Sequence, residues 1–167
     1  VKKDPTAVAK LMSDGSYAWT RTFGGPDEEV GETVAVTAGG YVLVVGAFRD
    51  TVDFDPSKGV DQRTPVDNPG TAYRDTNVFL TKLHSDGSYA WTRNFGGGTG
   101  QSEAHGIACD WAGEILVAGA FAGSVDFDPG SDVDVHSTVP LSFNVFVTKL
   151  DVNGDYVWTR TFGGAGA

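Results

Sequence analysis

The chain has 167 residues, of which 40% are hydrophobic and 20% charged, a composition typical of a globular protein rather than of a disordered one. The net charge of −10 argues against nucleic acid or anionic lipid as a partner and favours cations. The single cysteine excludes an internal disulfide, and no apolar run reaches the roughly 20 residues of a membrane-spanning helix.

The first segments of the chain predict a β-hairpin. "TAVAKLM" (6–12) and "YAWTRTF" (17–23) contain β-branched and aromatic residues, and both are about as long as an ordinary strand. Between them lies "SDGS" (13–16), whose Asp-Gly pair tolerates the positive φ angles of a tight turn. We therefore expect two antiparallel strands here.

The middle of the chain predicts four strands: "TVAVTA" (33–38), "YVLVVGAF" (41–48), "NVFLTKL" (77–83) and "YAWTRNF" (89–95). None of these segments has helical spacing of its apolar residues. Short Gly-containing turns join the first strand to the second and the third to the fourth, whereas a longer loop, Ser57–Thr76, joins the second to the third. This pattern predicts a four-stranded antiparallel sheet.

The same four segments recur as "GIACD" (106–110), "EILVAGAF" (114–121), "NVFVTKL" (144–150) and "YVWTRTF" (156–162). Ala104–Pro129 repeats Gly31–Pro56 73 positions later, and the loop Gly130–Phe143 carries most of the difference in length. We therefore divide the chain into a half unit over 1–25, full units over 26–97 and 98–164, and a tail over 165–167.

The second strand of the middle unit, Tyr41–Phe48, is apolar without alternation, which predicts that both of its faces are covered. A four-stranded unit of this size needs neighbours, and in a β-propeller each blade is packed between two others. We expect an all-β protein of about two and a half propeller blades, each with its first strand innermost and its fourth outermost, as part of a larger propeller or array. An open stack of the same sheets, or solenoid, is the alternative.

Two stretches, "GIACDWAGEILVAGAF" and "NVFVTKLDVNGDYVWTRTFGG", resemble the bacterial β-propeller repeat of the SBBP type, and the resemblance extends over essentially the whole chain. The resemblance implies a multi-blade array in an exported bacterial protein, secreted or anchored at the cell surface. It also implies a scaffold for binding, and no catalytic residue follows from it.

The strongest candidate for chemistry is "VDFDP", which follows the second strand in both full units. Asp53 with Asp55, and Asp126 with Asp128, are spaced to project to one side of an extended segment, where their oxygens could serve as ligands for Ca²⁺. The alternative is a turn in which one Asp accepts backbone N–H groups before the proline. Further acids lie near each pair: Asp50, Asp61, Asp67, Asp132 and Asp134.

A second candidate, for ligand binding, lies just before the first strand of each full unit, in the segments that return the chain to the propeller axis. Glu32 and His105 occupy equivalent positions there, and Glu103 lies two residues ahead of His105. Trp111, in a turn, is a candidate for a stacking contact. The alternative for all four is a solvated surface. The remaining tryptophans hold identical positions and are expected to pack between blades: Trp19, Trp91 and Trp158.

These features predict a non-enzymatic structural or binding module that presents loops to a protein or glycan, outside the cell, with calcium as the one candidate cofactor. Two other functions stay open. The chain could be the repeating subunit of an extracellular filament or surface layer, docking to further copies or blades of the same protein. It could also be a fragment of a propeller enzyme, a lyase or glycosidase, whose catalytic residues lie on other blades. No nucleic-acid binding and no membrane insertion are expected.

Overall fold

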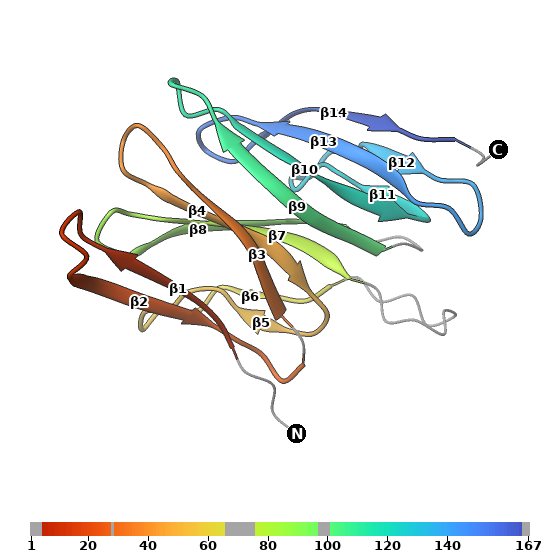
Figure 1. Ribbon diagram of the computed structural model, residues 1–167. Helices are drawn as coiled ribbons and strands as arrows, with labels where there is room; N and C mark the ends of the chain where they lie inside the picture. The colour runs from red at the N-terminus through yellow and green to blue at the C-terminus, as the bar shows by residue number, and fades with distance from the viewer. Residues whose placement is uncertain (1–4, 28, 66–75, 97–100, 165–167) are drawn as a thin grey trace.

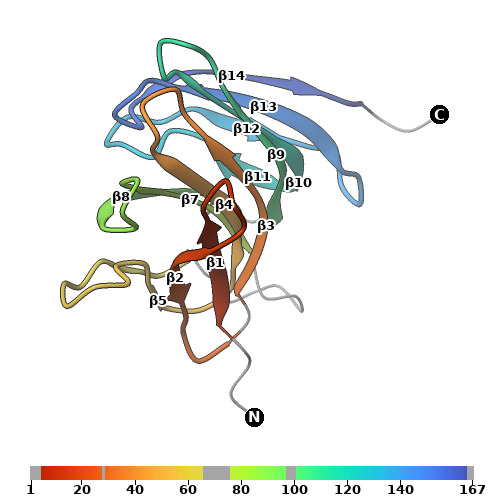
Figure 2. The same cartoon turned by 60° about the vertical axis from the view of Figure 1, so that its left-hand side comes forward.

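The computed structural model describes residues 5–27, 29–65, 76–96 and 101–164. Within these ranges the protein is all-β, as predicted, and no helix is long and apolar enough to span a membrane. The strands form three layers, which Figure 1 shows stacked from the first hairpin to the last sheet. Figure 2, turned by 60°, shows the same three layers.

The first layer is the predicted hairpin of β1 (Thr6–Leu11) and β2 (Tyr17–Phe23), which pair antiparallel. Its turn holds Gly15 at a φ of +83°, a conformation that glycine adopts without a steric cost. The register slips by one residue between Lys10 and Leu11.

The second and third layers are four-stranded antiparallel sheets with the predicted order of strands. The second contains β3 (Glu29–Val36), β4 (Val42–Phe48), β7 (Asn77–Leu83) and β8 (Tyr89–Phe95). The third contains β9 (Gln101–Cys109), β10 (Ile115–Ala122), β13 (Asn144–Leu150) and β14 (Tyr156–Phe162). Both sheets therefore run from the first strand to the fourth without a crossover.

The first strand of each sheet begins earlier than the sequence predicted. The register of β3 on β4 shifts between Gly31 and Thr33, and Glu32 is the extra residue of this bulge. In β9 the register shifts opposite Ala118 and Gly119, and His105 is the extra residue. The placement of Glu32, Glu103 and His105 ahead of the strands was therefore wrong, because a bulge absorbs one residue and pairing then continues.

Between the second and third strands of each full sheet lies a short hairpin that was not predicted. These are β5 (Val52–Asp53) with β6 (Gln62–Arg63), and β11 (Ser124–Asp126) with β12 (Val135–Ser137). Isolated bridges join Gly24 to Asp53 and Gly96 to Asp126. Each short hairpin is thereby attached to the residue that follows the last strand of the preceding layer, β2 or β8.

Two hydrophobic cores fill the spaces between the layers. Trp19 and Phe23 of the first layer pack on Val44 and Phe48 of the second. Leu43 and Val45 point the other way, into the core shared with the third layer. The prediction that the apolar second strand is covered on both faces is confirmed for β4, in which Val42, Leu43, Val44 and Val45 are all buried.

Candidate functional site

The paired aspartates of the two "VDFDP" segments hold their own loops. Asp53 Oδ1 accepts hydrogen bonds from the N–H of Asp55, at 3.1 Å, and from the N–H of Asp61, at 2.9 Å. Asp126 Oδ1 does the same with Asp128 and Asp134, again at 3.1 and 2.9 Å. The first aspartate of each pair thus binds both ends of its loop, the second end lying eight positions further along the chain.

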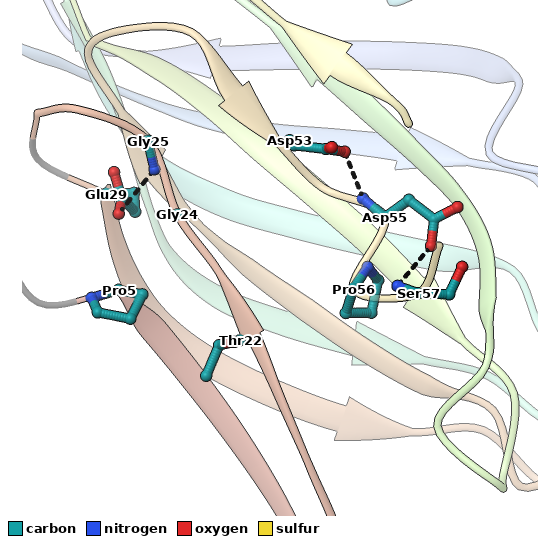
Figure 3. Close-up of a pocket in the computed structure, with 9 residues that line it drawn as sticks. All are labelled: Pro5, Thr22, Gly24, Gly25, Glu29, Asp53, Asp55, Pro56 and Ser57. Atoms are coloured by element: carbon teal, nitrogen blue, oxygen red, sulfur yellow. Dashed lines mark hydrogen bonds between the residues drawn. The ribbon is translucent and has the colours of Figure 1, made fainter. Parts of the chain in front are cut away.

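The second aspartate of each pair continues the turn. Asp55 Oδ1 accepts the N–H of Ser57 at 2.8 Å, a contact visible in Figure 3, and Asp128 Oδ1 accepts the N–H of Gly130 at 2.7 Å. These are the contacts of the turn interpretation. A hollow of about 380 Å³ lies beside the first pair, with Glu29 on its other side (Figure 3). Within the described ranges, no group of three or more His, Cys, Asp or Glu side chains could hold a metal ion, and calcium binding stays a prediction.

Replacing Asp126 by alanine should lower the free energy of unfolding by about 1–3 kcal/mol in calcium-free solution, because two partly buried backbone N–H groups lose a charged acceptor. Urea unfolding measures this loss, and Asp132→Ala, on the exposed part of the same loop, is the control.

Adding calcium tests the other interpretation, in which the paired aspartates are calcium ligands. A midpoint that rises in the native chain but not in Asp128→Asn supports a calcium site, whereas an unchanged midpoint leaves only the turn.

The phenylalanine between the two aspartates was missed by the sequence analysis, and its role is to pack between two layers. Phe54 and Phe127 are fully buried, and each lies at the centre of an aromatic cluster between two layers. The ring centroid of Phe54 lies 4.8 Å from that of Phe79, and the ring centroid of Phe127 lies 4.9 Å from that of Phe146. The alternation Asp-Phe-Asp carried the signal, since it turns the ring away from both carboxylates.

Two of the nearby acids bind tyrosines. The Tyr89 hydroxyl donates a hydrogen bond to Asp61 Oδ2, and Arg63 Nε lies 2.9 Å from Asp61 Oδ1. In the third layer, Tyr156 donates to Asp134 Oδ2, and His136 Nε2 lies 3.1 Å from the same oxygen. These contacts connect each short hairpin to the fourth strand of a four-stranded sheet, β8 for the first hairpin and β14 for the second. Burial and the hydrogen bond to Asp61 raise the pKa of the Tyr89 hydroxyl.

Replacing Tyr89 by phenylalanine should cost about 1–2 kcal/mol of unfolding free energy at neutral pH, because Asp61 loses a donor. The raised pKa of Tyr89 gives a second readout. The stability contributed by the neutral phenol is complete below about pH 10, where an unfolded tyrosine titrates, and falls as the pH rises towards the folded-state pKa. Unfolding should therefore become less pH-dependent above about pH 10 in Tyr89→Phe. Tyr17→Phe, at the equivalent but exposed position of the first layer, should change neither quantity.

The ligand-binding candidates are brought together in part. Glu32 and Glu103 line one hollow of about 140 Å³, with Arg49, between the bulged strands β3 and β9. His105 is exposed on β9, two residues beyond Glu103, and is not part of the lining. Trp111 is 90% exposed and lies beyond the opposite end of β9, so it belongs to a different surface.

Comparison with models of protein families found no match, and comparison with curated proteins found no significant match. The resemblance to the SBBP-type repeat accordingly rests on the sequence motifs alone.

Proposed function

We propose that this chain is a non-enzymatic binding module of an exported bacterial protein, and that its sheets are blades of the propeller type. Two four-stranded sheets with the same strand order support this reading, as does the second sheet, which is covered on both faces. The aromatic residue of each "VDFDP" segment packs between successive layers, as a spacer between blades would.

The hollow lined by Glu32, Arg49 and Glu103 is the observation that carries the binding function. It lies where the first strands of two successive sheets approach each other, and in a propeller these strands are the innermost. Bulges are a common means of redirecting side chains towards a binding site. Glu32 is itself the bulge residue of β3, and Glu103 lies two residues before the bulge of β9.

The chemistry of the hollow suits a polar, uncharged or cationic group. The two carboxylates accept hydrogen bonds, while the guanidinium of Arg49 is a donor. The hydroxyl groups of a glycan, or amide and basic groups on a protein, provide matching partners. The net charge of −10 disfavours anionic ligands by long-range repulsion. A small hollow on an open edge favours one protruding group of a larger partner.

The test is titration calorimetry against a panel of neutral and basic polysaccharides and of extracellular proteins. We expect at least one partner to bind the native chain, and Glu32→Gln combined with Glu103→Gln to weaken that binding by about tenfold or more. Trp111→Ala, at the other end of β9, should leave it unchanged. A panel without any binder, or binding that ignores the double variant, would contradict the proposal. Cleavage of a polysaccharide on incubation would favour the enzyme instead.

A further inference from the structure

Three side chains of the first layer donate hydrogen bonds to the turn between β7 and β8 of the second layer, and we call this set of contacts the grip. Arg21 Nε donates to the carbonyl of Gly87 at 2.7 Å, and Trp19 Nε1 donates to that of Ser85 at 3.1 Å. Lys10 Nζ also donates to the carbonyl of Ser85, at 2.7 Å. Three side chains of one layer thus hold the turn between the third and fourth strands of the next.

The second and third layers repeat this grip. Arg93 Nε donates to the carbonyl of Gly154 at 3.2 Å, and Lys82 Nζ donates to that of Val152 at 2.8 Å. In both grips the turn glycine lies against the tryptophan, since a Cβ on Gly87 or Gly154 would come within 2.8 Å of the ring of Trp19 or Trp91.

The third layer carries the same three side chains, Lys149, Trp158 and Arg160, and within the described ranges they hold no turn. Lys149 pairs instead with Glu114 of its own sheet. Arg160 Nη1 donates to the carbonyl of the adjacent Thr159 at 2.9 Å. We call the surface that bears these three residues the free face.

The free face also exposes apolar side chains at positions whose equivalents in the second layer are buried. Leu116, Val145 and Phe162 are 39%, 51% and 60% exposed. The residues at the equivalent positions of the second layer are 0–2% exposed, because the third layer covers them: Leu43, Val78 and Phe95. The free face therefore has the composition of a face that packs against another sheet.

One turn of the same kind is held by nothing in the described part of the chain. The first hairpin turns through Ser13–Ser16, with the same four residues as the gripped turn Ser85–Ser88. Gly15 has a φ of +83° and Gly87 one of +80°, yet a Cβ on Gly15 would meet no atom within 4 Å. The hydroxyl and N–H of Ser16 lower the pKa of Asp14, and those of Ser88 lower the pKa of Asp86. The two turns therefore match in their hydrogen bonds as well.

We propose that the free face binds the Ser13–Ser16 turn of a second copy of this chain. Trp158, Arg160 and Lys149 then grip this turn as Trp19, Arg21 and Lys10 grip Ser85–Gly87. The free face and the first hairpin lie at opposite ends of the stack in Figure 1, so the contact is head-to-tail and extends to further copies. This goes beyond the binding function proposed above and does not depend on it.

Analytical ultracentrifugation of the 167-residue chain over a range of concentrations tests the proposal. We expect reversible association that Arg160→Glu weakens by about tenfold or more, through loss of the grip. Gly15→Asn should weaken the association similarly, since Asn tolerates the left-handed turn but would place a Cβ against Trp158 of the second copy. Lys58→Glu, an exposed charge reversal elsewhere, should have no effect.

Mixing the two variants separates the alternatives. Arg160→Glu keeps an intact Ser13–Ser16 turn, and Gly15→Asn keeps an intact free face. Head-to-tail docking therefore predicts that the mixture forms a heterodimer and nothing larger. Symmetric docking of two free faces would instead be blocked by Arg160→Glu and indifferent to Gly15→Asn, which would overturn the proposal. A native chain that stays monomeric up to about 1 mM would overturn it as well.

Discussion

Replacing Phe127 by alanine should lower the free energy of unfolding by about 3–5 kcal/mol, the largest loss that we expect from a single side chain here. Its ring is fully buried and packs against Phe95 of the second layer and Phe121 and Phe146 of the third. The third layer relaxes poorly around the resulting cavity, because Phe127 is anchored by Asp126 on one side and fixed by the turn of Asp128 on the other.

Urea unfolding followed by tryptophan fluorescence measures the loss, and Phe54→Ala should behave in the same way between the first and second layers. Phe143→Ala is the control, because this ring is 65% exposed in the loop that leads into β13, and it should cost less than about 1 kcal/mol. A loss below about 1 kcal/mol in Phe127→Ala would mean that the aromatic cluster does not hold the layers together.

Replacing Gly119 of β10 by alanine should cost about 2 kcal/mol or more, because the bulged strand β9 opposite it leaves no room for a side chain. An added Cβ would lie 2.0 Å from the carbonyl oxygen of Glu103 and 2.8 Å from the ring of Phe146. Gly46 is equivalent in the second layer, where the Cβ would lie 1.9 Å from the carbonyl oxygen of Val30. Neither glycine has a positive φ, so the requirement comes from the close approach of the bulged strand.

Gly106→Ala is the matched control, on the bulged strand itself. Its Cβ would meet only Ala118, at 4.0 Å, and its φ is not positive. We expect it to be neutral or to stabilise the protein by up to about 1 kcal/mol, since alanine restricts the unfolded chain. If Gly119→Ala unfolded with the same midpoint as Gly106→Ala, the close approach at the bulge would not exist in solution.

The positions of the strands could be predicted because they depend on neighbours in the sequence. The β-branched and aromatic residues, the short lengths of the segments and the Gly-containing turns located most of the strands to within a few residues: β1, β2, β4, β7, β8, β10, β13 and β14. The first strands, β3 and β9, were placed too late. The bulges at Glu32 and His105 depend on the register with β4 and β10, which no local pattern encodes.

The candidate sites were predictable in residue type but not in role. The "VDFDP" motif drew attention to four aspartates, yet whether an Asp binds a metal or a backbone N–H depends on the path of the loop. Asp61 and Asp134 could be noted only as nearby acids, because their tyrosine partners lie 28 and 22 residues away in sequence. Glu32 and Glu103 share a hollow only because β3 and β9 are neighbours in space.

The sequence by itself determined the all-β character, the order of strands within each sheet and the positions of the turns, since hairpins form between segments close in the chain. The apolar run of β4 predicted that both of its faces are covered, but only the tertiary structure decided that one face of the equivalent strand β10 is partly exposed. Leu43 and Leu116 occupy the same position in equivalent strands, and the first is fully buried while the second is 39% exposed. The difference lies in whether another layer packs over the sheet, because burial is a property of the space around a side chain.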